Sequence, residues 1–187
     1  MAKKKPPSIK ITKLDAARNQ IDTALRLWFE DGDLVSIHTL TAAAHQICHA
    51  ILKHGGEEYP SMIFSLDLLS AEARAAYKKY ILAPENFFKH ATNDPYPNCQ
   101  IELPLRTTEL YLVDAVFLFH KLSSDMTPSM KAFALFFNLH NPDMLKDEAS
   151  KLIIESDGLD LRKIHKSFFL KAFLDQAEKF RLKYSFP

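Results

Sequence analysis

The sequence predicts an all-α protein, folded as a single-domain helical bundle of about six to eight helices that spans residues 13–187. Three observations predict it. Apolar residues recur at steps of three and four along most of the chain, which is the period of an amphipathic helix. No segment shows the two-residue alternation of a half-buried strand. The 187 residues are 47% apolar, which suits one domain with a substantial core.

Two helices are predicted at the start of the domain, after a disordered basic tail over residues 1–12. The first helix is predicted over 13–29, and its apolar face carries Leu14, Ala17, Ile21, Ala24, Leu25 and Trp28. Asp33 follows a turn and can cap the second helix, predicted over 34–53, because its carboxylate can accept a free backbone N–H. Gly55 is expected to end that helix.

The middle of the chain is divided by turn formers and prolines. A third helix is predicted over 61–82, with Ser70 as a point where it breaks and a fresh helix begins. A short helix is predicted to begin at Pro84, because proline at the first helical position leaves no N–H unpaired. The turn formers and prolines of residues 93–98 predict a loop, and residues 101–105 are expected to be extended.

Four helices are predicted in the remainder of the chain, again from apolar steps of three and four. The first begins at Thr107 or Thr108. The predicted ranges are 107–122, 128–141, 145–156 and 159–184. The residues of the last helix that are expected to face inward are Leu161, Ile164, Phe168, Phe169, Ala172, Phe173, Ala177 and Phe180.

The composition excludes several classes of function. A net charge of +1 predicts no strong overall attraction to nucleic acid, and 4 glycines without a GxGxxG or GxxxxGK[ST] pattern exclude a phosphate-cradling loop. Cys48 and Cys99 lack CxxC spacing, which predicts neither a thiolate zinc site nor a disulfide framework. No apolar run approaches the roughly 20 residues that cross a bilayer, and no signal peptide is indicated. We expect a cytoplasmic protein without a cofactor or a membrane partner.

The stretch PENFFKHATNDP, residues 84–95, is the strongest candidate for a functional site. Asn86 and His90 are four residues apart, so on a helix their side chains lie on one face within reach of each other. Imidazole has an unperturbed pKa near neutrality, which makes His90 a candidate general acid or base. The Asn86 amide can orient that ring or hold a phosphate oxygen. The alternative is that both are ordinary polar residues at the edge of a helix.

A second constellation consists of His38, His45 and His49. They share one stripe of a helix, because offsets of 7 and 11 residues return to within about 20° of the start. His45 and His49 have the spacing of a zinc-chelating pair. The sequence is HQICH rather than HExxH, so the usual catalytic glutamate is absent, and a further ligand such as His90 or Asp94 is needed. The alternative is that these are packing residues, each with one nitrogen satisfied.

Two parts of the chain resemble the HEPN domains (higher eukaryotes and prokaryotes nucleotide-binding), small all-α bundles found in many prokaryotic toxin, antiphage and RNA-processing proteins. The opening hairpin, ARNQIDTALRLWFEDGDLVSIHTLTAAAHQICHAIL, is similar to theirs in having an amphipathic helix, a short Gly-Asp turn and an alanine-rich helix. The segment NFFKH looks like the end of the family's R-N-x-x-x-H motif, with Asn86 and His90 on its Asn and His. The resemblance covers roughly residues 14–95. The longer stretch NFFKHA-x-x-DP also resembles one in uncharacterised bacterial proteins.

This resemblance implies a specific chemistry. In active HEPN nucleases the Arg and His form a metal-independent RNA-cleaving site, often assembled across a dimer. The 2′-OH attacks the adjacent phosphate, and the Arg offsets the developing charge. In this chain Glu85 stands at the Arg position and inverts its charge. Catalysis would then need a substitute cation, such as Lys89, Lys78, Lys79 or one from a partner chain.

We therefore expect a non-catalytic HEPN-like binding module of a bacterial protein, acting as a homodimer. Its expected partner is RNA, a nucleotide or another protein, and its expected binding residues are Lys89, Asp94 and His38. The first alternative is a metal-independent HEPN-type ribonuclease that uses His90 and Asn86. A third hypothesis is a histidine-based metal-binding protein. Loss of the Arg would cost on the order of 10²–10³ in rate, which favours the binding module over the nuclease.

Overall fold

The computed structural model describes residues 7–58, 60–64, 70–91, 95–142 and 163–184. Within these ranges the chain forms six helices and no strand, which confirms the predicted all-α bundle. The helices are α1 (Lys13–Phe29), α2 (Leu34–His54), α3 (Ala71–Lys89), α4 (Leu105–Ser123), α5 (Pro128–His140) and α7 (Lys166–Tyr184). None of these described helices is long and apolar enough to cross a bilayer. The helix predicted over 145–156 and the first six residues of the predicted tail lie outside the described residues.

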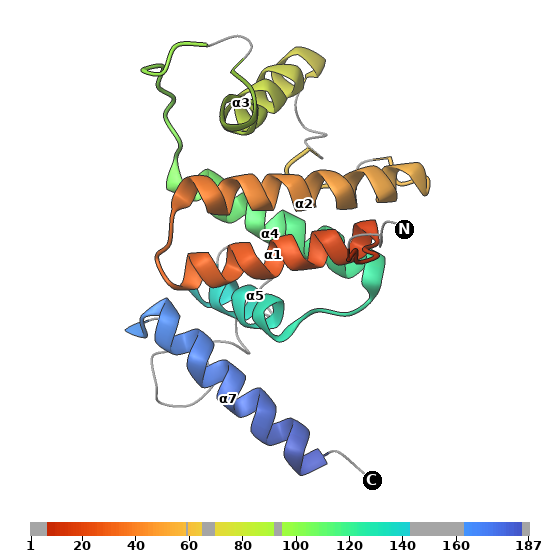
Figure 1. Ribbon diagram of the computed structural model, residues 1–187, viewed down its shortest axis with the longest axis vertical. Coiled ribbons are helices and arrows are strands. Elements are labelled where there is room, and N and C mark those ends of the chain that lie inside the picture. Colours follow the sequence, from red (N-terminus) through yellow and green to blue (C-terminus); the bar gives the residue numbers. More distant parts are fainter. Residues whose placement is uncertain (1–6, 59, 65–69, 92–94, 143–162, 185–187) are drawn as a thin grey trace, which may run out of the picture.

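Four helices form the centre of the bundle, and two lie at its ends. α1 packs along α2, α2 packs along α4, and α5 lies against α1 and α4. Figure 1 shows α3 above α2 at one end of the molecule and α7 beyond α5 at the other end. α3 packs mainly on α2, and α7 packs mainly on α5. The helix that carries the NFFKH segment is therefore a peripheral helix that rests on the central group.

Local hydrogen bonds cap the starts of α1 and α2. The Oγ1 of Thr12 accepts a hydrogen bond from the backbone N–H of Asp15 at 3.0 Å, and the Asp15 carboxylate accepts one from the Thr12 N–H at 3.1 Å. The carboxylate of Asp33 accepts from the backbone N–H of Ser36 at 2.7 Å, as predicted for the cap of α2. Gly55 follows the last residue of α2, also as predicted.

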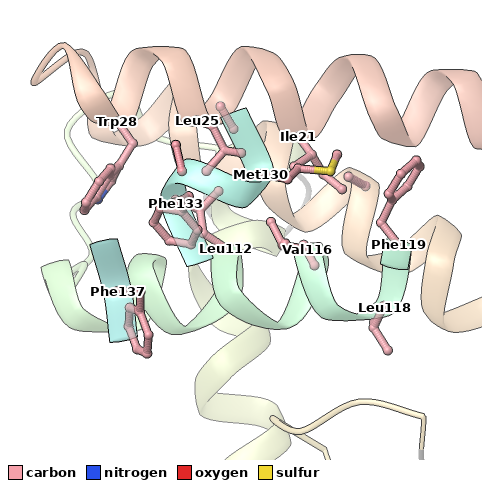
Figure 2. Packing of buried hydrophobic residues seen from close by; sticks show 14 of the residues in the cluster. Ile21, Leu25, Trp28, Leu112, Val116, Leu118, Phe119, Met130, Phe133 and Phe137 are labelled. Carbon is pink, nitrogen blue, oxygen red and sulfur yellow. The ribbon is translucent and has the colours of Figure 1, made fainter. Parts of the chain in front are cut away.

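The hydrophobic core lies where α1, α2, α4 and α5 meet, and Figure 2 shows part of it. The buried residues labelled there are Ile21, Leu25, Trp28, Leu112, Val116, Leu118, Phe119, Met130, Phe133 and Phe137. Trp28 lies edge to face with Phe133, with 5.0 Å between ring centroids. Burial of each large apolar side chain stabilises the fold by about 1.5–3 kcal/mol, so this core holds the central helices together.

The structure corrects part of the prediction for α3. Ser70 is the N-cap of this helix, which confirms the predicted fresh start, but residues 61–64 form turns and not the predicted first part of a helix. No new helix begins at Pro84, because Pro84 lies inside the continuous helix. An interior proline costs a helix about 3 kcal/mol or more. Ile81, Pro84 and Glu85 are buried on one face of α3, and Glu85 is bonded there to Gln46 of α2.

α4 starts earlier than predicted. It begins at Leu105, with Pro104 as its N-cap, so the extended segment ends one residue sooner than expected. The backbone N–H of Thr107 donates to the Pro104 carbonyl at 3.0 Å. Thr107 and Thr108 therefore lie within the first turn and do not open the helix.

α7 also differs from its prediction. It begins at Lys166, because residues 163–165 are not α-helical. Phe168, predicted to face inward, is 69% exposed, whereas Phe169 is buried. Adjacent residues point about 100° apart on a helix, so only one of the two faces the core. The start of α7 is held by the turn after α1, where the Asp31 carboxylate accepts a hydrogen bond from Lys166 at 2.7 Å and lies 3.2 Å from His165.

Candidate functional site

The predicted pair Asn86 and His90 lies on the surface at the C-terminal end of α3. Asn86 is in the last turn, and His90 is the C-cap, with an extended backbone conformation. The backbone N–H of His90 donates to the Asn86 carbonyl at 3.0 Å. Both side chains are exposed, and neither forms a hydrogen bond or ion pair with another described residue. The two side chains are accessible from solvent, but none of the described residues orients the imidazole ring.

Glu85, at the position where the HEPN motif has arginine, is buried beneath α3. Its side chain is 2% exposed, and its Oε1 accepts hydrogen bonds from Lys89 and from Gln46 of α2, each at 2.5 Å. The bond from Gln46 joins α3 to α2, and the Lys89 ammonium group, on the same helix as Glu85, offsets the buried negative charge. Lys89, a predicted binding residue and a candidate substitute cation, therefore has its ammonium group paired with Glu85.

The three predicted histidines of α2 form a row of stacked rings with Tyr111 of α4. Ring centroids are 5.5 Å apart for His38 and Tyr111, 4.7 Å for Tyr111 and His45, and 6.0 Å for His45 and His49. The Tyr111 ring separates His38 from His45, so the three imidazoles do not converge on one point. Across the described residues, no group of three or more His, Cys, Asp or Glu side chains is arranged to hold a metal ion. The row of rings packs α2 against α4.

Two of these histidines are fully buried, and each has one nitrogen with a partner. His38 Nδ1 lies 3.1 Å from Thr108 Oγ1, and His45 Nε2 lies 2.9 Å from the Asp114 carboxylate. For His38 and His45 this arrangement matches the second hypothesis of the sequence analysis, in which the histidines pack in the core with one nitrogen satisfied. Burial, reinforced by the charge of Lys89 and opposed by that of Glu85, holds the pKa of His38 below its usual value.

The Asp114 carboxylate is the centre of a buried polar cluster. Besides His45, it accepts hydrogen bonds from the Ser61 hydroxyl and from the backbone N–H groups of Met62, at 2.9 Å, and Ile63, at 3.3 Å. Burial alone would raise the pKa of Asp114, but the hydrogen bonds from His45, Ser61 and Met62 lower it below its ordinary value. The carboxylate thus holds the turn over residues 61–64 against α2 and α4.

Ser61, His45 and Asp114 are the residue types of a hydrolytic triad, but their geometry is different. In a triad, one imidazole nitrogen faces the serine and the other faces the carboxylate. Here Ser61 and Asp114 both lie against Nε2 of His45, at 3.3 and 2.9 Å, and the serine also donates directly to the carboxylate. All three side chains are fully buried, so no substrate reaches the hydroxyl. The cluster is structural.

A basic pocket opens beside this cluster, between α2 and α3. Its volume is about 140 Å³. Its charged walls are Lys53 of α2, Arg74 and Lys78 of α3, and one carboxylate, Glu58. The remaining walls are apolar or aromatic and include His49, Ile63, Phe64 and Tyr77. We call this site the basic pocket below.

The basic pocket surrounds a neutral imidazole with positive charge. Burial, together with His45, Lys53 and Lys78, holds the pKa of His49 below its usual value, against a smaller opposite effect of Asp114. Lys78 Nζ lies 5.6 Å from the centroid of the Phe64 ring. The positive charges in the pocket are therefore those of lysine and arginine, and Glu58 supplies a negative charge.

The other predicted site residues are not brought together. Asp94 lies outside the described residues. Lys79 is exposed on α3, whereas Lys78, one residue earlier, lines the basic pocket. The pocket lies twelve residues before His90 along α3, roughly 18 Å at the helical rise. Lys78 therefore does not serve the imidazole of His90 within one chain.

Sequence reasoning missed Asp114 and the basic pocket, although signals for both are present. Asp114 interrupts the apolar run LYLVDAVFLF, where a charged residue faces the core. The pocket cations follow the helical period, with Lys53 one turn after His49 and Lys78 one turn after Arg74. Neither signal says which second helix completes the site.

No protein-family model, curated protein sequence or solved structure matches this chain. The resemblance to HEPN domains therefore rests on the sequence patterns alone.

Proposed function

We propose that this protein is a non-catalytic, HEPN-like module that binds RNA. The observation that carries the proposal is the buried Glu85 with its two bonds to Lys89 and Gln46. At the position of the family's catalytic cation the chain has a carboxylate, and the nearest lysine is paired with it. An RNA-cleaving site needs positive charge to stabilise the transition state, and this pairing removes it.

The support for binding is a surface that combines cations with aromatic rings. Lys53, Arg74 and Lys78 supply positive charge for phosphates, while Phe64 and Tyr77 supply rings. Single-stranded nucleic acids are bound by such combinations, because bases stack on the rings while cations contact the backbone. A homodimer is part of the proposal through the family resemblance. Sedimentation velocity at micromolar concentration checks it, and a stable monomer would contradict it.

The alternative function is a metal-independent ribonuclease that uses His90 and Asn86. The exposure of both side chains favours it, since a substrate can reach the imidazole from solvent. In this alternative the cation comes from another subunit.

The test compares the full-length wild type with His90→Ala on a mixed-sequence RNA, with and without EDTA. We expect no cleavage by either protein. We expect both to bind a labelled single-stranded RNA in fluorescence anisotropy, with an affinity that falls as salt is raised. His54→Ala, made at another exposed histidine, is the matched control.

Two results would contradict the proposal. Cleavage that survives EDTA and is absent in His90→Ala, but not in His54→Ala, would establish the ribonuclease. Lack of saturable RNA binding at low salt would exclude RNA as the ligand and direct the search to a protein partner.

A further inference from the structure

The basic pocket has the composition of an anion site. Three cationic side chains, from Lys53, Arg74 and Lys78, face one carboxylate, Glu58, in a cavity of about 140 Å³. The imidazole of His49 is held neutral by burial and by these lysines, so it adds a ring and not a further charge. A ligand with two negative charges would match the charges of the two lysine ammonium groups.

The size of the pocket limits what enters it. Pockets that enclose a drug-sized ligand measure roughly 300 Å³ or more, so this pocket takes one chemical group while the rest of the ligand remains outside. A phosphate monoester suits it, because it carries close to two negative charges and several acceptor oxygens. The donors that line the pocket are the ammonium groups of Lys53 and Lys78 and the Tyr77 hydroxyl, while the Arg74 guanidinium has a partner of its own and adds positive charge to the wall.

The aromatic residues indicate what carries the phosphate. Phe64 and Tyr77 are half-buried, so part of each side chain is accessible at the pocket. Phe64 makes edge-to-face contacts with His49 and His45, with ring centroids 5.5 and 5.4 Å away, and Lys78 lies over its ring. A ring fixed in this way is a platform for a planar group next to the phosphate.

One wall of the basic pocket is held in place by the buried cluster around Asp114. Ile63 and Phe64 belong to the turn that Asp114 holds, since the Ile63 N–H donates to the carboxylate and the Phe64 N–H donates to Ser61 at 3.2 Å. The buried cluster thus positions one wall of the pocket. α2 and α3 supply the cations of the other walls.

We propose that the basic pocket binds the phosphate monoester of a nucleotide, with the base on the Phe64 and Tyr77 side. The ligand is either a free mononucleotide or the 5′-phosphate end of an RNA, and the latter source rests on the proposed function. This site is separate from the Asn86 and His90 pair at the other end of α3.

The test uses calorimetric titration of the full-length protein with four probes: AMP, inorganic phosphate, and one RNA hexamer with either a 5′-phosphate or a 5′-hydroxyl. The variants are Lys53→Gln and Lys78→Gln, with Lys79→Gln as the matched control. The control removes the same charge from the next residue of α3, so long-range electrostatics change equally. Circular dichroism melts check that all three variants fold.

We expect AMP or the 5′-phosphorylated hexamer to bind more tightly than inorganic phosphate. We expect Lys53→Gln and Lys78→Gln each to weaken that binding about tenfold, because each removes a charge-assisted hydrogen bond, while Lys79→Gln changes it less than about twofold. Preference for the phosphorylated over the hydroxyl hexamer would identify the RNA end as the ligand. Binding of AMP alone would identify the free nucleotide.

The inference is overturned if Lys53→Gln and Lys78→Gln bind every probe as the wild type does, or if Lys79→Gln loses as much affinity as they do. If AMP binds no more tightly than inorganic phosphate, the pocket does not recognise the nucleoside, and that part of the inference is wrong. If Lys53→Gln and Lys78→Gln bind RNA as tightly as the wild type, the protein binds RNA at another surface and the proposed function is retained. If the pocket variants weaken AMP binding and no RNA binding is detected, the proposed function is refuted, but the inference that the basic pocket binds a nucleotide is retained.

Discussion

The carboxylate of Asp114 on α4 lies 2.9 Å from Nε2 of His45 on α2, and both side chains are fully buried. Since a carboxylate only accepts hydrogen bonds at neutral pH, this nitrogen carries the proton. The pair joins α2 to α4, and the Asp114 carboxylate also holds the turn that begins at Ser61.

The first prediction concerns the stability that this carboxylate provides. Asp114→Asn is expected to lower the free energy of unfolding by about 2–4 kcal/mol, because the amide cannot accept from all four donors that face the carboxylate. Urea denaturation followed by circular dichroism measures it. Asp175→Asn removes the same charge at an exposed position of α7 and should change stability by less than about 0.5 kcal/mol. Equal losses in the two variants would show that the cluster contributes nothing specific.

The second prediction concerns the docking of α3. Lys89→Met is expected to cost about 1–2 kcal/mol of unfolding free energy, because it leaves the buried Glu85 carboxylate with Gln46 as its remaining partner. Adding Glu85→Gln to Lys89→Met should restore part of that loss, with a coupling energy near 1 kcal/mol in a double-mutant cycle. Lys79→Met serves as the exposed control. If the effects of the two substitutions are additive, the coupling energy is zero and the ion pair does not contribute to stability.

The third prediction is a dependence of stability on pH. Burial in the folded state holds the pKa of His38 below the ordinary histidine value of about 6.5, so near that pH the unfolded chain binds a proton at this residue that the folded chain does not. The stability contributed by the neutral imidazole is therefore present above pH 6.5 and is lost as the pH falls below it. One such proton is worth up to about 2 kcal/mol between pH 6.5 and pH 5. His38→Asn should flatten the wild-type decline over that interval, and parallel pH profiles for the two proteins would refute the assignment.

The fourth prediction uses the two cysteines. Cys48 is buried, and burial raises the pKa of its thiol to about 12, whereas Cys99 is partly exposed. A thiolate-specific reagent such as Ellman's reagent at pH 8 should therefore modify Cys99 in the native protein and reach Cys48 only in denaturant. Cys99→Ser should abolish the native reaction. Rapid modification of both thiols in native wild type would contradict the packing of α2.

The sequence predicted the helices well where their ends depend on local bonds. The caps at Asp33 and Ser70 and the glycine after α2 all depend on neighbours within a few residues, so the pattern is visible in the chain itself. Pro84 was predicted wrongly as a helix start, because it lies inside one continuous helix from Ala71 to Lys89, on the buried face that it shares with Ile81 and Glu85. Phe168 was predicted wrongly as buried, because periodicity does not say which of two adjacent phenylalanines faces α5.

By itself, the sequence determined that this protein is an all-α bundle, because the 3.6-residue period of apolar residues and the capping signals act over one or two turns. Only the tertiary structure decided which polar groups meet. It joined Asp114 to His45 and to Ser61, across separations of 69 and 53 positions, and it brought the cations of α2 and α3 around one pocket. Such contacts depend on how helices lie against one another, and that follows from the packing of the whole core and not from any short stretch of chain.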